Sequence, residues 1–438
     1  MNPLFELSAH RAAQLIKDKK ISSVELTGAC LERISERDDE LHAWQLVDFE
    51  GAMAAAVRAD NNALKEGLLH GVPVGLKDII DTAELPTTYG SRAFSHHQPT
   101  RNADCVNLLQ EHGAIIVGKT VTTEFAFFAP GPTVNPHNHA HTPGGSSSGS
   151  AAAVADFHVP LALGTQTAGS IVRPASFNGI LGYKPSFDCY SNAGVHPLAP
   201  SLDTLGPFAR ELDDLHLLNR VLARNKPSLA LDTRKPTRVV VVRTPYWEQA
   251  SEEMRFTFEA FADAISGDGI EVVDAATIIT NLDADLEFIS ECQLLLMAVE
   301  AKEILAPIAQ KYGEVIRPET KSLIEQGLQA PTDAKSRIEN AKAKSENMMS
   351  ALASAGDLIL TPSSLGAAPP GIRETGDPIF NRAWTFAHAP CINIPLARNE
   401  SHLPIGAQVV AAHGQDEALL RLAKYLVSLS PYQILPPG

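Results

Sequence analysis

The chain has 438 residues, with 36 Lys plus Arg against 51 Asp plus Glu, which gives a formal net charge of −15. This acidic balance argues against a nucleic-acid partner, because phosphate binding needs a basic face. With 44% hydrophobic and 20% charged residues, the composition is that of a globular protein with a large core, and it excludes the disordered and fibrous classes.

Two predicted helices open the chain. Ser22 and Glu25 form an S-x-x-E capping box, and Leu26, Cys30 and Ile34 then repeat at a four-residue step, which gives one apolar stripe. The N-terminal residues lack the charged and apolar regions of a signal peptide, and no stretch reaches the roughly 18 apolar residues of a membrane helix. We therefore expect no membrane partner.

From Gly71 onward the sequence consists largely of short aliphatic runs separated by turn residues. They predict strands at 72–76, 115–117, 159–163, 239–242, 270–273, 358–360 and 392–394. Helical patterns lie between several of them, for example at 105–112 and 256–265. Strands that alternate with helices indicate an α/β protein whose mixed or parallel sheet is covered on both faces. Segments 225–238 and 332–348 have the composition of a linker and of a charged helix.

Five cysteines are dispersed along the chain without a CxxC pair, as Cys30, Cys105, Cys189, Cys292 and Cys391. This spacing excludes the usual zinc and redox motifs, and we expect neither a metal nor a cofactor. An odd, dispersed set predicts reduced thiols and a cytoplasmic location.

Residues 113–120 match the phosphate-loop pattern G-x-x-x-x-G-K-T letter for letter. In a phosphate loop the glycine-rich stretch follows a strand and opens a helix. Here the four variable positions are themselves apolar, and residues 121–123 are β-branched. We interpret the segment as a strand and not as a nucleotide site.

The segment 144–150 is a Gly/Ser loop that leads directly into an apolar helical stretch. Free N–H groups at a helix start favour developing negative charge. The segment also contains G-x-S-x-G at 145–149, which suggests an α/β-hydrolase with Ser147 as nucleophile. That geometry needs a preceding strand, and the Pro- and His-rich residues 135–143 make a poor one, so this interpretation is kept as an alternative.

A second serine lies in the segment 164–174. Small residues before Ser170 allow successive backbone N–H groups to converge on one point, as an oxyanion hole requires. Ser170 is therefore a candidate nucleophile, and it needs a base. Lys77 ends an apolar run, where loss of water would lower its pKa far below the usual value of about 10.4 and let it act as a general base.

Together these segments resemble the amidase signature family. Lys77 in GVPVGLKDIID, Ser146 in GGSSSGS and Ser170 in LGTQTAGSIVRPAS stand 69 and 24 residues apart, which suits the Lys-Ser-Ser triad of that family. The resemblance extends through residues 202–209, 375–385, 391–395 and 403–411. Within the family it is strongest to malonamidase-type enzymes, through residues 135–138 and the GGSSSGS and LALGTQT segments.

The resemblance implies one domain over residues 1–438, with a mixed central sheet between layers of helices. Residues 71–210 would form the signature core, and 225–350 a more peripheral, mostly helical region. It also implies a serine amidohydrolase that cleaves linear carboxamide C–N bonds through an acyl-enzyme and releases an acid and ammonia or an amine. The partner would be a small-molecule amide, and a homodimer is expected from relatives.

The resemblance also implies the role of each residue. Ser170 attacks the carbonyl carbon, Ser146 takes its proton after a cis peptide bond that follows Gly145, and Lys77 is the ultimate base. The backbone N–H groups of Thr167, Ala168, Gly169 and Ser170 would bind the oxyanion. Many members have Gly where this chain has Ala168, so a turn that needs positive φ would be strained there.

Substrate choice is open at this stage. In malonamidase-type enzymes the arginine that matches Arg173 binds the substrate carboxylate, next to Gly145, but a structural role is an equal alternative. Phe125 and Phe128, with Phe127 between them, suggest an apolar pocket for aryl amides or carbamates, unless these rings belong to the core. A glutamine-dependent amidotransferase A-type subunit, which passes ammonia to a partner complex, shares the signature and is the further alternative.

Overall fold

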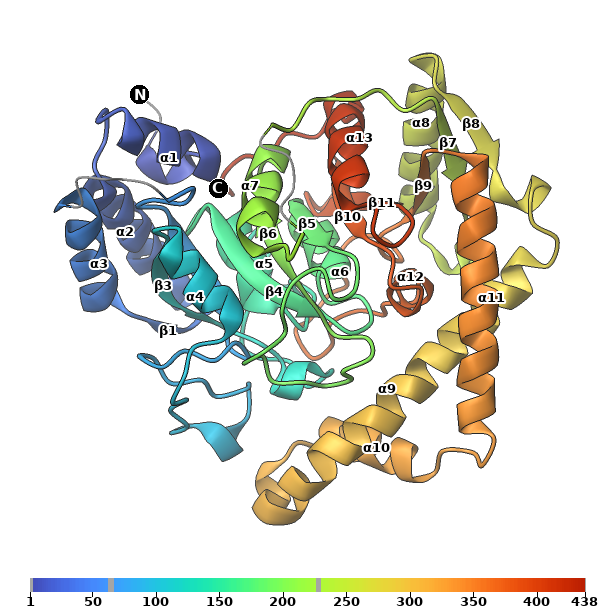
Figure 1. Ribbon diagram of the computed structural model, residues 1–438, viewed down its shortest axis with the longest axis horizontal. Coiled ribbons are helices and arrows are strands. Elements are labelled where there is room, and N and C mark those ends of the chain that lie inside the picture. The colour runs from blue at the N-terminus through green and yellow to red at the C-terminus, as the bar shows by residue number, and fades with distance from the viewer. Residues whose placement is uncertain (1–2, 62–66, 226–229, 438) are drawn as a thin grey trace.

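One mixed sheet runs through the molecule (Figure 1). The computed structural model describes residues 3–61, 67–225 and 230–437. Within these ranges, eleven strands follow the order β1-β3-β2-β4-β6-β5-β10-β11-β9-β7-β8. Their bounds are β1 Trp44–Val47, β2 Pro73–Lys77, β3 Ile115–Thr120, β4 Leu161–Gln166, β5 Leu181–Lys184, β6 Thr204–Ala209, β7 Arg238–Val241, β8 Glu271–Asp274, β9 Leu358–Pro362, β10 Cys391–Arg398 and β11 Pro404–Val410.

Strand directions divide the sheet into parallel and antiparallel parts. Strand β2 is parallel to β3 and to β4, and β7 is parallel to β8 and to β9, whereas the pairings β4–β6, β5–β6, β5–β10, β10–β11 and β9–β11 are antiparallel. The predicted α/β class with a mixed sheet is confirmed, and each of the seven predicted strands overlaps an observed one. The segment that matches the phosphate-loop pattern is strand β3.

Helices pack around this sheet, and α5 and α6 lie in the middle of the molecule (Figure 1). Their bounds are α1 Ala9–Lys17, α2 Ser23–Leu41, α3 Phe49–Asn61, α4 Asp104–Glu111, α5 Ser148–Ala155, α6 Val172–Asn178, α7 Leu212–Leu222, α8 Glu252–Gly267, α9 Leu282–Tyr312, α10 Pro318–Leu328, α11 Ala334–Ala355, α12 Arg382–Phe386 and α13 Asp416–Leu429. None of the helices in the described ranges is long and apolar enough to cross a membrane. Of the linker-like segment 225–238, residues 226–229 lie outside the described residues.

The start of α2 shows the predicted capping box. The hydroxyl of Ser22 accepts a hydrogen bond from the N–H of Glu25, and the Glu25 carboxylate accepts one from the N–H of Ser22 at 2.7 Å. Leu26, Cys30 and Ile34 are all buried, as their four-residue repeat predicts. Helix α2 therefore presents one apolar face to the rest of the domain.

Helix α5 lies within the core and packs against β2, β3, β4 and β6. All eight of its residues are buried, and they are only serine, glycine, alanine and valine. Small side chains let the helix approach the strands closely. Its hydroxyls are satisfied locally, since Ser150 Oγ donates to the Leu163 carbonyl at 2.9 Å. The helix thus places uncharged serine hydroxyls at the centre of the molecule.

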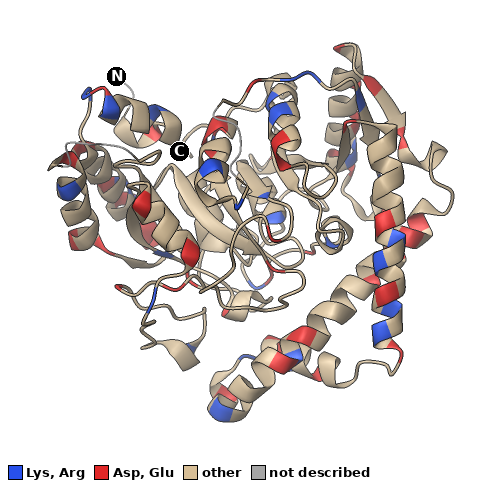
Figure 2. Ribbon diagram, in the orientation of Figure 1, with Lys and Arg blue, Asp and Glu red and all other residues tan. Residues whose placement is uncertain are grey.

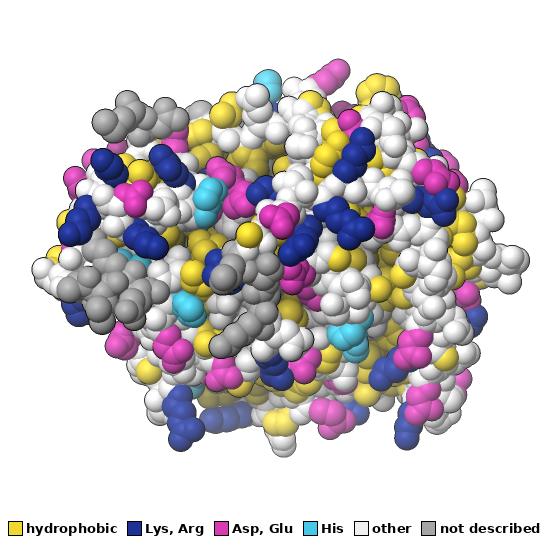
Figure 3. All heavy atoms as spheres, turned by 45° about the horizontal axis from the view of Figure 1, so that its top comes forward, with side chains coloured by type: hydrophobic (Ala, Val, Ile, Leu, Met, Phe, Trp, Pro, Cys, Tyr) yellow, Lys and Arg dark blue, Asp and Glu magenta, His cyan; other side chains and the backbone are white. Residues whose placement is uncertain are grey.

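Helices α9, α10 and α11 lie together to one side of the sheet (Figure 1), and α9 packs against α10, α11 and α12. Acidic and basic residues are interspersed along α11 (Figure 2), as is typical of a solvated helix face. On the face shown in Figure 3, acidic and basic side chains are likewise interspersed. The solvated surface of α11 thus contrasts with the buried helix α5, which carries no charged residue.

Candidate active site

Lys77 ends strand β2 and is completely buried. Its Nζ lies 2.7 Å from Oγ of Ser146 and 2.8 Å from Oγ1 of Thr165. Because β2 and β4 are parallel neighbours, their carboxyl ends meet at one edge, and Thr165 sits near the end of β4. The sheet therefore brings the lysine and this threonine together.

The surroundings of Lys77 favour its neutral form. Burial lowers the pKa of Lys77 well below its ordinary value, and the charge of Asp203 opposes this shift only in part. Asp203 is itself buried, and burial raises the pKa of its carboxyl to about 6. An amine with a lowered pKa carries a free electron pair near neutral pH, which a general base requires.

Ser146 follows Gly145 through a cis peptide bond. The Gly145 carbonyl accepts a hydrogen bond from Nη2 of Arg173 at 2.6 Å. A side chain at position 145 would place its Cβ 2.8 Å from Cγ2 of Thr375, so glycine is required by this close approach. The loop is thus held from both sides directly before Ser146.

Ser146 and Ser170 line the same small chamber. Its volume is about 20 Å³, room for about one water molecule. The chamber wall combines the two serines with two aromatic rings, one arginine and small or apolar side chains: Ala126, Phe127, Phe128, Ser146, Thr167, Ala168, Ser170, Arg173, Leu198, Met297, Thr375 and Pro378. The structure therefore brings all three predicted triad residues to one place, since Lys77 contacts Ser146.

Residues 167–170 form the loop between β4 and α6. In the part of the chain that the structure describes, no protein acceptor faces the N–H groups of Ala168, Gly169 and Ser170. Free N–H groups beside a nucleophile can bind a developing oxyanion. Ala168 does not adopt a positive φ, so the strain expected for alanine at this position is absent.

Arg173 belongs to the chamber wall and is buried. Its Nη2 donates to the Gly145 carbonyl and to Thr375 Oγ1 at 3.2 Å, whereas Nε and Nη1 are buried without a partner among the described residues. Burial lowers the pKa of Arg173 to about 9. A buried guanidinium with two unpartnered nitrogens is suited to an anion.

The three aromatic residues 125, 127 and 128 take different places. Phe127 and Phe128 line the chamber, and the Phe128 ring centroid lies 5.9 Å from Cζ of Arg173. Phe125 is 1% exposed and packs edge-to-face on Phe94 in the core. Phe125 does not line the chamber, and its contact with substrate stays a prediction.

The alternative nucleophile Ser147 lies outside the chamber wall. It is completely buried, and its Oγ bonds the backbone of Thr165, 3.1 Å from the carbonyl and 3.2 Å from the N–H. The described residues 135–143 form no strand, so the strand-turn-helix geometry of a nucleophile elbow is missing. The α/β-hydrolase interpretation is wrong.

Several residues at the site were not singled out from the sequence. Thr165 stands inside the LGTQTAGS segment, and Thr375 and Thr385 bound the TGDPIFNRAWT segment, so the motifs contained them without marking a role. The other two, Gln293 and Met297, belong to α9. For Gln293 the only available signal was a single amide in a run of apolar residues, ECQLLLM.

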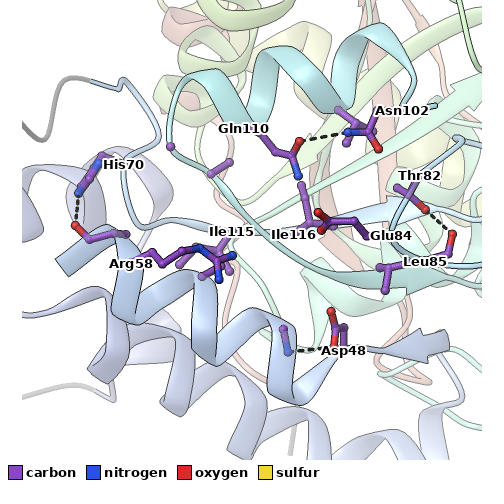
Figure 4. A pocket seen from close by; sticks show the side chains of 16 residues that line it. Asp48, Arg58, His70, Thr82, Glu84, Leu85, Asn102, Gln110, Ile115 and Ile116 are labelled. Carbon is purple, nitrogen blue, oxygen red and sulfur yellow. Dashed lines mark hydrogen bonds between the residues drawn. The ribbon is translucent and has the colours of Figure 1, made fainter. Parts of the chain in front are cut away.

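Two further hollows differ from the chamber in position and lining. One has a volume of about 420 Å³, shares Phe128, Thr375 and Pro378 with the chamber, and is rimmed by charged residues including Arg373 and Asp377. The other, of about 530 Å³, lies between α3, α4 and β3, where Arg58, His70, Glu84 and Gln110 surround it (Figure 4). None of the three predicted triad residues lines this second hollow.

Comparison with known proteins connects this geometry to a family. Residues 25–420 match the family model described as Amidase. The chain is 35% identical over 324 residues to the A-type subunit of the glutamyl-tRNA(Gln) amidotransferase from Acidothermus cellulolyticus, and the match covers 70% of this chain and 63% of that protein. With the corresponding protein of Salinispora tropica it is 30% identical over 486 aligned positions, which cover 98% of each chain.

Solved structures show the same architecture. The native peptide amidase of Stenotrophomonas maltophilia matches with a TM-score of 0.83 and 25% identity, covering 100% of this chain and 99% of that one. A crystal structure described as an amidase matches with a TM-score of 0.86 and 27% identity, covering 97% and 100%. The finer likeness to malonamidase-type enzymes stays a prediction, because these relatives carry other names. The predicted family is confirmed: the chain belongs to the Amidase family.

Proposed function

We propose that the chain is a serine amidohydrolase that cleaves a linear carboxamide. Oγ of Ser170 bonds to the amide carbon as its proton passes to Ser146, and the Ser146 proton passes to Nζ of Lys77. The tetrahedral intermediate then breaks its C–N bond, and the proton returns along the same groups to the departing nitrogen. Water repeats the sequence on the acyl-enzyme and releases the acid.

One observation carries this proposal: a fully buried lysine contacts Ser146 at 2.7 Å in the wall of a chamber shared with Ser170. Burial supplies a base with a lowered pKa, and the N–H groups of Ala168, Gly169 and Ser170 supply donors for the oxyanion. Each such donor contributes roughly 3 kcal/mol in enzymes where it has been measured. The reaction needs no metal or cofactor in this scheme.

Covalent labelling tests the proposed nucleophile directly. A fluorophosphonate that reacts with activated serines should attach to Ser170, as mapped by peptide mass spectrometry. Attachment to any other serine, or no attachment to a folded protein that hydrolyses amides, would contradict the assignment.

An amidotransferase A-type subunit is the second candidate, favoured by the names of the sequence relatives. Such a subunit would release ammonia from glutamine and pass it to a partner complex. Ammonia release by the isolated chain should then be weak with simple amides and should rise for L-glutamine when a partner complex is added. Rapid hydrolysis of simple amides without any partner would favour the self-contained amidohydrolase.

The chamber also bears on the substrate class. The two unpartnered nitrogens of Arg173, Nε and Nη1, support an amide that carries a carboxylate, a property shared by malonamate and glutamine. Phe127 and Phe128 support instead an aryl amide or carbamate. A homodimer and a cytoplasmic location are further proposals, and light scattering on the purified chain tests the first.

A further inference from the structure

Three consecutive carbonyl groups of the oxyanion loop are each held by a donor. The Thr167 carbonyl accepts from Nε2 of Gln293 at 2.9 Å, and the Ala168 carbonyl accepts from Oγ1 of Thr385 at 2.6 Å. The Gly169 carbonyl accepts from the N–H of Arg173 at 3.0 Å, within the first turn of α6. Only the last of these donors is backbone; the first two are side chains from α9 and α12.

Holding a carbonyl also sets the direction of the N–H that follows it. In a trans peptide the C=O and the next N–H point in opposite directions. Gly145–Ser146 is the one cis bond in the described ranges, so the peptides of residues 167–170 are trans. The donors on these carbonyls therefore turn the N–H groups of Ala168, Gly169 and Ser170 to the other side, where no protein acceptor lies among the described residues.

Gln293 reaches the loop from a distant part of the sequence. It is completely buried on α9, 126 residues from Thr167. Met297 lies one turn further along α9 and lines the chamber. Residues four apart lie on one face of a helix. Helix α9 thus presents both side chains to the site, although residues 225–350 are expected from the sequence to be peripheral.

The hydrogen-bond direction at Thr385 follows from its neighbour Gln166. Oε1 of Gln166 accepts from the N–H groups of Ile171 and Val172 at 2.9 and 3.0 Å, which fixes the orientation of the amide. Nε2 of Gln166 must then be the atom that donates to Oγ1 of Thr385 at 2.9 Å. The hydroxyl of Thr385 has one proton, which it donates to its nearest acceptor, the Ala168 carbonyl at 2.6 Å.

We propose that Gln293 and Thr385 are positioning residues, which turn the peptide planes of residues 167–169 so that the N–H groups of Ala168 and Gly169 face the oxyanion. This proposal rests on Ser170 as the nucleophile. Neither side chain contacts the substrate; each acts through a backbone carbonyl. Removal of either donor leaves a buried carbonyl unpaired, and the peptide gains freedom to rotate its N–H out of position.

The test compares rates of Ser170 labelling by a fluorophosphonate, since the bound P=O oxygen needs the same donors as the oxyanion. Thr385→Val keeps the shape and removes the hydroxyl, whereas Thr385→Ser keeps the hydroxyl. We expect labelling at least about 10-fold slower in Thr385→Val and a rate within about twofold of wild type in Thr385→Ser. Gln293→Met, which keeps the length of the side chain, should slow labelling as Thr385→Val does.

A matched control separates positioning from general loss of stability. Tyr190→Phe also removes one buried hydrogen bond, the 2.9 Å contact with Oδ1 of Asn219, and should label at the wild-type rate. With an amide substrate, Thr385→Val and Gln293→Met should lower kcat and leave KM nearly unchanged. The proposal would be overturned if wild type, Thr385→Val and Gln293→Met are labelled at equal rates. It would also be overturned if Thr385→Ser is labelled as slowly as Thr385→Val.

The same experiment keeps the two proposals apart. Wild-type protein that never labels at Ser170 contradicts the proposed nucleophile. Wild-type protein that labels at Ser170, together with variants that label equally fast, contradicts the positioning roles alone. If one variant does not fold, the other still tests the proposal, because Gln293 and Thr385 lie on different helices and hold different carbonyls.

Discussion

Nζ of Lys77 lies 2.7 Å from Oγ of Ser146, across 69 residues of sequence. Three parallel neighbours, β3, β2 and β4, form the part of the sheet at which this contact occurs, and α5 begins directly after Ser146 and Ser147. The lysine is therefore placed by the sheet and the serine by a helix start. Both elements are buried, so the contact is held by the core and not by a surface loop.

Lys77 should make stability depend on pH in a defined direction. Its folded pKa lies below the unfolded value of about 10.4, so between the two values the unfolded chain binds the additional proton. The free energy of unfolding should therefore rise with pH in that window. Lys77→Met removes the titrating group, and denaturant unfolding of both proteins from about pH 6 to pH 9 should show a smaller slope for the variant. Equal slopes would contradict the lowered pKa.

Loss of the base should affect turnover more than stability. Lys77→Ala should lower kcat by several orders of magnitude, because Ser146 then has no group to which its proton can pass. Wild-type activity should fall as the pH drops below the folded pKa of Lys77, since the protonated amine cannot accept a proton. A circular dichroism melt confirms that the variant folds, and near wild-type turnover in Lys77→Ala would exclude this role.

The two serines at 147 and 170 should respond differently to substitution. Ser170→Ala should abolish turnover, whereas Ser147→Ala should keep it and lose about 1 kcal/mol of unfolding free energy, the usual net value of one hydrogen bond. Ser147 bonds only the Thr165 backbone and lies outside the chamber wall. Hydrolysis rates and thermal melts of the two purified variants check this, and active Ser170→Ala protein would refute the nucleophile.

Arg173 offers a test of the substrate class. If its free Nε and Nη1 bind a carboxylate, Arg173→Met should lower kcat/KM for malonamate about 10- to 100-fold more than for propionamide, given about 1.5–3 kcal/mol for a charge-assisted hydrogen bond. The comparison within one variant cancels any effect of the lost bond to Gly145. Equal losses for both substrates, with a lowered melting temperature, would indicate that Arg173 is structural.

The capping box of α2 provides a variant that changes stability alone. Ser22→Ala should lower the free energy of unfolding by about 1 kcal/mol, because the N–H of Glu25 loses its acceptor at the helix start. Ser22 is remote from the chamber wall, so kcat and KM should stay at wild-type values. Denaturant unfolding and a standard amide assay measure the two quantities, and changed kinetics would contradict the expectation.

The sequence predicted seven strands correctly and missed β1, β5, β6 and β11. Strands β6 and β11 each contain a glycine and a proline, which by themselves argue against a strand. Strands β5 and β1 lack a run of β-branched residues. In each case pairing with neighbours decides the structure: β6, for example, is paired with β4 along its entire length. Such pairing is a property of the tertiary fold and leaves little trace in local composition.

At the site, residues inside dense motifs were predictable and isolated ones were not. Lys77, Ser146 and Ser170 stand in segments with a recognisable spacing. Gln293 stands on a helix whose other residues are ordinary core, and its partner carbonyl lies 126 residues away. The backbone has positive φ at both Phe125 and Ala126, a turn that aromatic composition does not encode, and Phe125 lies in the core while Phe127 and Phe128 line the chamber.

The position of β10 and β11 in the sheet affects the order in which the chain can fold. They lie between β5 and the group β9-β7-β8, yet they are made after both. Strand β5 keeps an open edge until β10 is made, and β7, β8 and β9 have no link to the rest of the sheet until β11 is made. Thr385, whose hydroxyl bonds the Ala168 carbonyl, stands shortly before β10 in the sequence, so the loop 167–170 gains this contact only after most of the chain has been made.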